Sequence, residues 1–223
     1  LAIYEEIYLY KQWWKTYYEA ERLKKENLQT QLDSLKSQIQ PHFLFNNLST
    51  LSSLVAEDPK KAERFIEELS SVYRYLLQNN DQPLTTLENE LNFIDAYFHL
   101  LQTRFGNGLR LIKDIPTAKL SYLIPPLTLQ LLVENAVKHN AILSHQPLKI
   151  TIYADDSNDL FVVNNLQVKS KSLPSDKTGL ANISSKYSQL GQPHVVVRQT
   201  EHIFQVKVPL INPSNTSVTY GGL

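Results

Sequence analysis

The sequence contains no cysteine and no methionine. The first absence excludes a disulfide scaffold, a thiolate metal site and a cysteine nucleophile. The second leaves no initiator residue, and we therefore expect this chain to be a piece of a longer protein. The sequence also lacks an apolar run of the ~20 residues that a membrane-spanning helix requires. Glu5, Glu6 and Lys11 interrupt the opening stretch, which excludes a signal peptide there.

Neither sign of charge is in excess, because 22 lysines and arginines are balanced by 22 aspartates and glutamates. A domain that binds nucleic acid usually carries a basic surplus, so no direct contact with nucleic acid is expected. Hydrophobic residues make up 42% of the chain and charged residues 20%, which is ordinary for a soluble globular protein. Composition alone therefore leaves the function open.

Residues 7–39 are predicted to form one long helix. The stretch lacks glycine and proline, and its apolar residues recur at alternating steps of three and four. A parallel coiled-coil dimer is the favoured interpretation, and a helix of an intramolecular bundle is the alternative. Aromatic residues near the start suit a packed core at least as well as a membrane interface. These residues are Tyr4, Tyr8, Tyr10, Trp13 and Trp14.

Pro41 interrupts this helical pattern directly before His42. Proline inside a helix removes a backbone hydrogen bond and kinks the axis, which is unusual for an element that only packs. A second helix is predicted to begin at Asp58-Pro59, where proline occupies the first turn, and to end near Asn79. Together these segments predict an antiparallel helical hairpin.

The remainder of the chain mixes helices with short strands, so the predicted fold class is α+β. A third helix is predicted to start at Thr85, whose hydroxyl would form a capping box with Glu88, and to end near Gly106. We expect a coiled coil and helical hairpin over 1–82, a linking helix and α/β sandwich over 83–211, and a disordered tail over 212–223. Further helices are predicted over 125–141 and 179–190, and strands over 109–115, 148–154, 160–165, 194–200 and 203–210.

His42 has the chemistry of a phosphoryl acceptor. Such a residue needs an exposed imidazole with a neutral nitrogen, and a reference pKa of about 6.5 leaves much of a histidine neutral in the cytosol. Asn46 lies one helical turn further on the same face, where its side chain would bond one ring nitrogen and leave the other to attack. The alternative is that His42 continues the packed seam of Ile39, but the surrounding sequence favours the acceptor.

Four segments, in order along the chain, carry a family resemblance. They are QIQPHFLFNNL (Gln38–Leu48), LENELNFIDAYFHLLQTRF (Leu87–Phe105), PPLTLQLLVENAVKHN (Pro125–Asn140) and TGLANISSKY (Thr178–Tyr187). These segments resemble the phosphoacceptor box, the linking helix, the N box and the glycine box of LytS-like sensor histidine kinases. The resemblance extends over nearly the whole chain.

The resemblance implies a homodimeric helical phosphoacceptor unit joined to an ATP-binding domain of the GHKL (Bergerat) fold. The implied enzyme is an ATP-dependent protein-histidine kinase, which phosphorylates His42 with Mg²⁺-ATP. The phosphoryl group would then pass to an aspartate in the receiver domain of a response regulator, often one with a LytTR-type DNA-binding domain. The implied location is the cytoplasmic portion of a bacterial inner- or plasma-membrane protein, with its upstream membrane sensor region outside this chain.

The N box carries polar residues suited to magnesium and phosphates. An amide oxygen such as that of Asn135 is a hard ligand for Mg²⁺, and Glu134 would orient a metal-bound water or accept a proton. By resemblance, Asn135 is the magnesium ligand, and Lys138, His139 and Asn140 line the phosphate edge. The alternative is a polar stripe on an amphipathic helix.

Four further positions concern the nucleotide. Gly179 and Leu180 open a helix, where backbone amides can approach phosphates at the positive end of the helix dipole. Asn164 stands where the family often has the aspartate that recognises adenine, and Leu166 replaces a glycine. An amide selects adenine less sharply than a carboxylate, because its NH₂ group is also a donor. A catalytically silent dimeric scaffold is therefore the second hypothesis. The box around His42 disfavours a third, an ATPase without a histidine acceptor.

Overall fold

The computed structural model describes residues 10–19, 21, 22, 24, 41–79, 82–167 and 178–215. The chain divides into two compact units, Leu1–Thr50 and Leu51–Leu223, and each is described by itself. The expected domain limit after residue 82 stays a prediction. Within the described ranges, no helix has both the length and the apolar character needed to cross a membrane.

The first unit contains a helix over residues 10–19, whose aromatic side chains pack on one another. The rings of Trp13 and Tyr17 stack with centroids 5.7 Å apart. Both remain largely exposed, at 58% and 50%, so these rings cover the surface of their own helix. The predicted coiled-coil seam from Leu28 to Ile39 lies outside the described residues.

Helix α2 (Pro41–Glu57) begins at the proline that interrupts the predicted pattern. Proline suits this first turn, because the first N–H groups of a helix have no intrahelical partner. Helix α3 (Pro59–Asn79) follows, and Asp58 Oδ1 accepts the backbone N–H of Lys61 at 3.1 Å. The predicted start and end of this helix are therefore confirmed. The residues before Pro41, on which the predicted kink depends, lie outside the described part of the chain.

The second unit combines helices with strands, which confirms the predicted α+β class. Every strand predicted from periodicity is present within a few residues of its expected limits, whereas two short strands, β1 and β3, were not predicted. Beyond α3, the elements are β1 (Thr85–Thr86), α4 (Leu87–Phe105), η1 (Gly106–Gly108), β2 (Leu109–Asp114), η2 (Thr117–Lys119), β3 (Leu123–Ile124), α5 (Thr128–His139), β4 (Leu148–Ala154), β5 (Asp159–Asn165), α6 (Thr178–Gln189), β6 (Val196–Gln199), β7 (Ile203–Pro209) and η3 (Pro213–Asn215).

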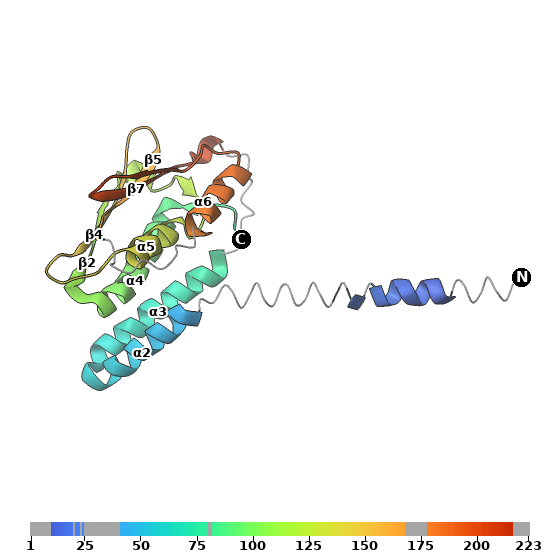
Figure 1. Ribbon diagram of the computed structural model, residues 1–223, viewed down its shortest axis with the longest axis horizontal. Coiled ribbons are helices and arrows are strands. Elements are labelled where there is room, and N and C mark those ends of the chain that lie inside the picture. The colour runs from blue at the N-terminus through green and yellow to red at the C-terminus, as the bar shows by residue number, and fades with distance from the viewer. Residues whose placement is uncertain are drawn as a thin grey trace, which may run out of the picture. The chain divides into compact units, whose positions relative to one another are not determined.

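One sheet of five strands, in the order β2-β4-β5-β7-β6, organises the second unit. Only β2 and β4 are parallel, and the crossover that parallel strands require contains α5. Alternate residues of β4 and β5 are buried, including Leu148, Ile150 and Leu160 at 0% exposure. Helices α4, α5 and α6 lie on one side of this sheet (Figure 1). The period-two burial therefore directs one sheet face toward the helices.

The start of α4 corrects the predicted capping box. The hydroxyl of Thr86, not that of Thr85, accepts the N–H of Asn89 at 3.2 Å. Thr85 is buried in β1, which pairs antiparallel with β3. This pairing keeps the chain extended through Thr86 and shifts the cap by one residue, so the predicted box of Thr85 and Glu88 is wrong.

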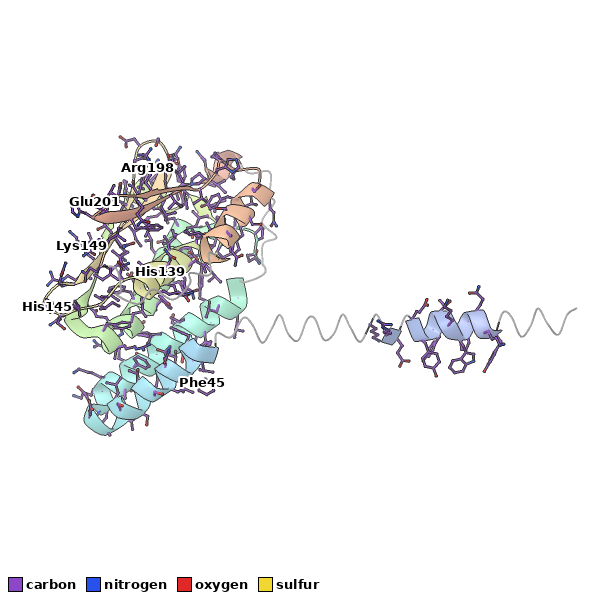
Figure 2. The ribbon with its side chains drawn as sticks, viewed as in Figure 1. Phe45, His139, His145, Lys149, Arg198 and Glu201 are labelled. Atoms are coloured by element: carbon purple, nitrogen blue, oxygen red, sulfur yellow. The ribbon has the colours of Figure 1, made fainter. Side chains whose placement is uncertain are left out.

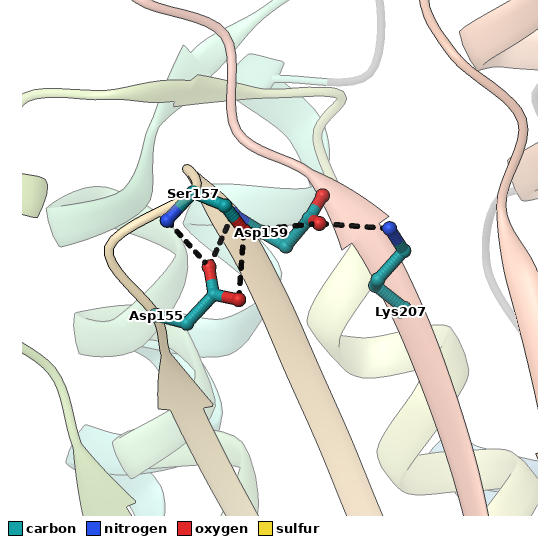
Figure 3. Close-up of polar contacts among 4 residues, drawn as sticks. All are labelled: Asp155, Ser157, Asp159 and Lys207. Atoms are coloured by element: carbon teal, nitrogen blue, oxygen red, sulfur yellow. Dashed lines mark hydrogen bonds and ion pairs between the residues drawn. The ribbon is translucent and has the colours of Figure 1, made fainter.

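A carboxylate stabilises the turn between the antiparallel strands β4 and β5 (Figure 3). Asp155 Oδ1 accepts the N–H groups of Ser157 at 3.1 Å and Asp159 at 3.0 Å. Asp159 in turn forms an ion pair with Lys207 of β7 at 2.8 Å. Burial acts to raise the pKa of Asp155, but the hydrogen bonds from Ser157 and Asp159 outweigh it and lower that pKa below 3.8.

Asp155→Asn is expected to lower the free energy of unfolding at pH 7 by about 1 kcal/mol or less, because a partly exposed hydrogen-bonded carboxylate contributes modestly. A lowered folded pKa stabilises the protein fully above the unfolded value near 3.8, and this stabilisation disappears as pH falls through the folded value. Urea unfolding between pH 3 and 7 should show the two proteins converging at low pH. The exposed neighbour in Asp156→Asn is the control, and an equal loss there would contradict the assignment.

Candidate functional site

Helix α5 carries most of the predicted nucleotide-binding residues along the boundary between core and solvent. Its apolar side, with Val133 fully buried, packs against β4 and β5. Glu134 and Asn135 are half-buried, and Lys138 is exposed. His139 is half-buried at the C-terminal end of the helix (Figure 2). The structure thus places these polar side chains on one helix edge, as the amphipathic pattern predicts.

Asn140 connects the end of α5 to the segment that follows β5. It is 2% exposed, and its Nδ2 donates to the carbonyl of Ala136 at 2.8 Å. Its Oδ1 accepts the N–H of Gln167 at 2.7 Å, while the N–H of Ala141 donates to the carbonyl of Gln167, also at 2.7 Å. Both ends of the amide are used within the fold, so Asn140 fixes the end of α5 to the segment that follows β5.

Asn164 ends a buried row on the face of β5 that is turned toward the helices. Leu160 and Val162 precede it on this face, and Asn164 itself is 5% exposed. Its Nδ2 donates to the carbonyl of Asn165 at 2.8 Å. This bond uses one of the two N–H donors of the amide, and the amide oxygen has the acceptor character of the aspartate that the resemblance implies at this position.

Helix α6 packs against α5 and opens at the predicted glycine. Gly179 and Leu180 are half-buried in its first turn. A Cβ atom added at Gly179 would have no described atom within 4 Å. Packing among the described residues therefore does not require glycine at this position, whereas close approach of a ligand to the backbone would.

A buried carboxylate that is not among the predicted site residues lies at the start of α5. Glu90 of α4 is 0% exposed and accepts three hydrogen bonds. Two come from the backbone N–H groups of Leu127 at 2.7 Å and Leu129 at 3.0 Å, at the start of α5. The third comes from the Tyr75 hydroxyl at 2.7 Å. Glu90 therefore joins three helices at one point.

Charges around the site shift the pKa of several side chains. Burial raises the pKa of Tyr97 on α4, and the nearby Glu134 carboxylate raises it further. Burial lowers the pKa of Lys186 on α6, while the Glu90 carboxylate opposes this change. Lys186 Nζ donates to the carbonyl of Pro126 at 2.9 Å. This hydrogen bond places Lys186 at the start of α5.

The predicted phosphoacceptor box occupies the first turns of α2. Phe45 is 66% exposed (Figure 2), Asn46 is half-buried and Asn47 is buried. Asn47 Nδ2 donates to the carbonyl of Phe43 at 2.7 Å. The backbone of His42 is helical, but its side chain lies outside what the structure describes. The bond between His42 and Asn46 stays a prediction.

Comparison with known proteins assigns part of the chain to a family. Residues 30–109 match the family model described as histidine kinase. This segment is similar to the histidine kinase family. The predicted resemblance is therefore confirmed.

The histidine kinase relatives include two curated LytS proteins. Sensor protein LytS of Bacillus cereus is 42% identical over 121 residues, which cover 54% of this chain and 20% of that protein. Sensor histidine kinase/phosphatase LytS of Staphylococcus aureus is 37% identical over 121 residues, which cover 54% of this chain and 21% of that protein. The chain thus spans about a fifth of the length of these relatives.

Solved structures of histidine kinases are more distant. The blue-light activated histidine kinase of Erythrobacter litoralis has 15% identity and a TM-score of 0.37, covering 78% of this chain and 62% of that chain. Histidine kinase AdeS of Acinetobacter baumannii has 11% identity and a TM-score of 0.40, covering 77% of this chain and 98% of that chain.

The histidine kinase segment contains His42, Asn46 and the unpredicted Glu90. The first two belong to the unit Leu1–Thr50, and the predicted nucleotide-binding residues belong to the second unit. Glu90 falls three residues after Leu87 and one before Leu91, within the buried stripe of α4. An acidic residue inside an apolar stripe was the signal in the sequence that would have identified it.

Magnesium is the remaining element of the predicted site. Across the described ranges, no group of three or more histidine, aspartate and glutamate side chains is placed to hold a metal ion. Mg²⁺ that bridges substrate phosphates needs only one or two protein ligands and keeps several waters. The single amide of Asn135 fits that donor set.

Proposed function

We propose that this chain is the kinase core of a sensor histidine kinase, which transfers a phosphoryl group from Mg²⁺-ATP to His42. The observation that carries the proposal is the match of residues 30–109 to the histidine kinase family. His42 lies in this match, in the first turn of α2 beside the proline of the phosphoacceptor box. The other residues of the box, from Phe43 to Leu48, are also helical.

The nucleotide would bind between α5, the end of β5 and the start of α6. Three features of the second unit support this placement. The Asn164 amide is oriented by its bond to the carbonyl of Asn165, and its oxygen would accept the exocyclic amine of adenine. Gly179 has no packing reason to be glycine among the described residues. Glu134 and Asn135 share a helix edge with Lys138 and His139, which would face the phosphates.

The proposed reaction is an in-line transfer at the γ-phosphorus. A neutral ring nitrogen of His42 forms a bond to that phosphorus while the bond to the bridging oxygen breaks, and ADP leaves. The Asn46 side chain accepts the N–H of the other ring nitrogen and so fixes the tautomer. When bound, Mg²⁺ neutralises phosphate charge. Asn135 would hold the ion, and Glu134 would orient one of its waters.

The proposal implies a response-regulator partner, a homodimer and a cellular location. The phosphorylated histidine would donate to an aspartate in the receiver domain of a response regulator, which we expect to be of the LytTR type. The segment before Pro41 would mediate homodimerisation through its heptad pattern. The chain would then be the cytoplasmic portion of a bacterial membrane protein and would receive its signal through this coiled coil.

Calorimetric titration with a non-hydrolysable ATP analogue and Mg²⁺ tests the nucleotide site. We expect saturable binding with one nucleotide per chain. Replacing the ATP analogue with the matching GTP analogue should weaken binding, because Asn164 would face an oxygen in place of an amine. The absence of binding at millimolar nucleotide would contradict the kinase and support a catalytically silent scaffold.

A further inference from the structure

Helix α5 begins without a cap of its own. Leu127 precedes it in the left-handed backbone region, with φ of 66°, and makes no side-chain cap. A leucine in this region is strained by roughly 1 kcal/mol or more. Pro125 and Pro126 come before it and provide no N–H groups. The first N–H groups of α5 must therefore find partners elsewhere in the fold.

Glu90 provides the missing cap from another helix. Its Oε1 accepts the N–H of the strained Leu127, and its Oε2 accepts the N–H of Leu129. A carboxylate at the positive end of a helix is also favoured by the helix dipole. Burying a carboxylate at 0% exposure is costly unless it is fully hydrogen-bonded. The geometry of this bidentate contact sets where α5 begins, and hence where Asn135 lies two turns later.

Tyr75 of α3 anchors the same carboxylate. Its hydroxyl donates to Glu90 Oε1 at 2.7 Å, the oxygen that also accepts from Leu127. Its ring stacks on Phe93 of α4 with centroids 4.4 Å apart, and Phe93 stacks in turn on Tyr97 at 6.0 Å. Tyr75 thus contacts both the carboxylate at the start of α5 and the row of aromatic rings on α4.

We propose that Glu90 is a positioning residue for the nucleotide site and that Tyr75 couples the position of α3 to that of α5 through it. The reference to a nucleotide site rests on the proposed function, whereas the coupling of the two helices does not. A shift of α3 relative to α4 would move or break the Tyr75–Glu90 bond. The freed carboxylate would then hold the strained start of α5 less firmly, and the polar edge of that helix would lose its fixed position.

Hydrogen exchange measured by mass spectrometry tests this coupling without any nucleotide. In Glu90→Gln, one acceptor oxygen becomes an NH₂ group that faces a backbone N–H, and we expect exchange in residues 127–131 to rise about tenfold or more. In Tyr75→Phe the cap remains but its anchor is lost. We expect a rise of roughly threefold at the same α5 amides, although Tyr75 lies on a different helix.

Matched variants separate positioning from general destabilisation. Glu88→Gln is the control for Glu90→Gln, because Glu88 is exposed in the first turn of α4. Tyr73→Phe is the control for Tyr75→Phe, because it removes a tyrosine hydroxyl two residues away on α3. Both should leave residues 127–131 unchanged, and the β4 amides should keep wild-type exchange in all four variants. If Tyr75→Phe leaves the α5 amides at the wild-type rate, or if β4 exchange rises by the same factor, the coupling is contradicted.

Nucleotide titration of the same proteins distinguishes this inference from the proposed function. Glu90→Gln should weaken binding of the ATP analogue by about tenfold, as expected for the loss of one charge-assisted contact that orients the site, and Glu88→Gln should not. A wild-type protein that binds no nucleotide would contradict the proposed function, while the exchange rates would still decide the coupling. Wild-type affinity in Glu90→Gln would show that the residue does not position the site.

Discussion

Replacing His42 with glutamine is expected to abolish ATP-dependent, acid-labile labelling of this protein. Glutamine is polar and similar in length, but its amide nitrogen has no available lone pair to attack phosphorus. A phosphoryl group on an imidazole nitrogen is lost in acid and kept in base, whereas phosphate esters of serine and threonine survive acid. Incubation with γ-labelled ATP and Mg²⁺, followed by parallel acid and base treatment, measures the effect. The wild-type signal should disappear in acid.

His202→Gln is the matched control, because His202 is exposed in the turn between β6 and β7. This variant should be labelled as the wild type is. Binding of the ATP analogue should be the same in all three proteins, since His42 belongs to a different unit from the nucleotide residues. Persistent acid-labile label in His42→Gln would remove His42 as the acceptor, even if the protein binds ATP.

Asn135→Ala is expected to weaken nucleotide binding in the presence of Mg²⁺ by roughly 10- to 100-fold, a range comparable to the loss of a residue that supports a metal site. Asn135 is half-buried on the polar edge of α5, beside the fully buried Val133 and Ala136 that hold the helix on the sheet. Removing its amide takes away the proposed ligand without changing the packed side. Calorimetry with the ATP analogue measures the loss.

Chelation of the metal provides the decisive comparison for Asn135. With EDTA in excess, the wild type and Asn135→Ala should bind the analogue equally weakly, because the amide acts through Mg²⁺. The exposed amide of Asn92 on α4 provides the control in Asn92→Ala, which should keep wild-type affinity with magnesium. A loss of affinity in Asn135→Ala that is equally large with EDTA would mean that the amide contacts the nucleotide directly.

The proposed coupling through Glu90 gives the helical part of the chain a physical route to the nucleotide site. Helix α3 follows α2, which carries the proposed acceptor His42, after a single residue, Asp58. A signal that shifts these helices would reach the start of α5 through the Tyr75 hydroxyl. Because α5 carries the proposed magnesium ligand, the same shift would change the affinity for Mg²⁺-ATP. Regulation of the kinase would then need no contact between the signal and the nucleotide.

Periodicity in the sequence correctly predicted the regular elements with strong local patterns. The apolar face of α5 and the alternation in β4 and β5 are each contained within one segment, so burial of that segment determines them. The motif around His42 was equally local, and the resemblance that it carries agrees with the match to the histidine kinase family model. The sequence also predicted the polar edge of α5, because Asn135 and Lys138 recur at helical spacing.

Only the tertiary structure determined which hydrogen bonds connect these elements to one another. Glu90 caps α5 from 37 and 39 residues away, and no periodic pattern connects positions so distant. Thr85 enters a two-residue strand because Ile124 pairs with it, which moved the predicted cap to Thr86. The Asn140 amide oxygen accepts the N–H of Gln167, 27 residues away. Local patterns report which side of a segment is buried, whereas the partner of a buried polar group depends on which distant segment packs against it.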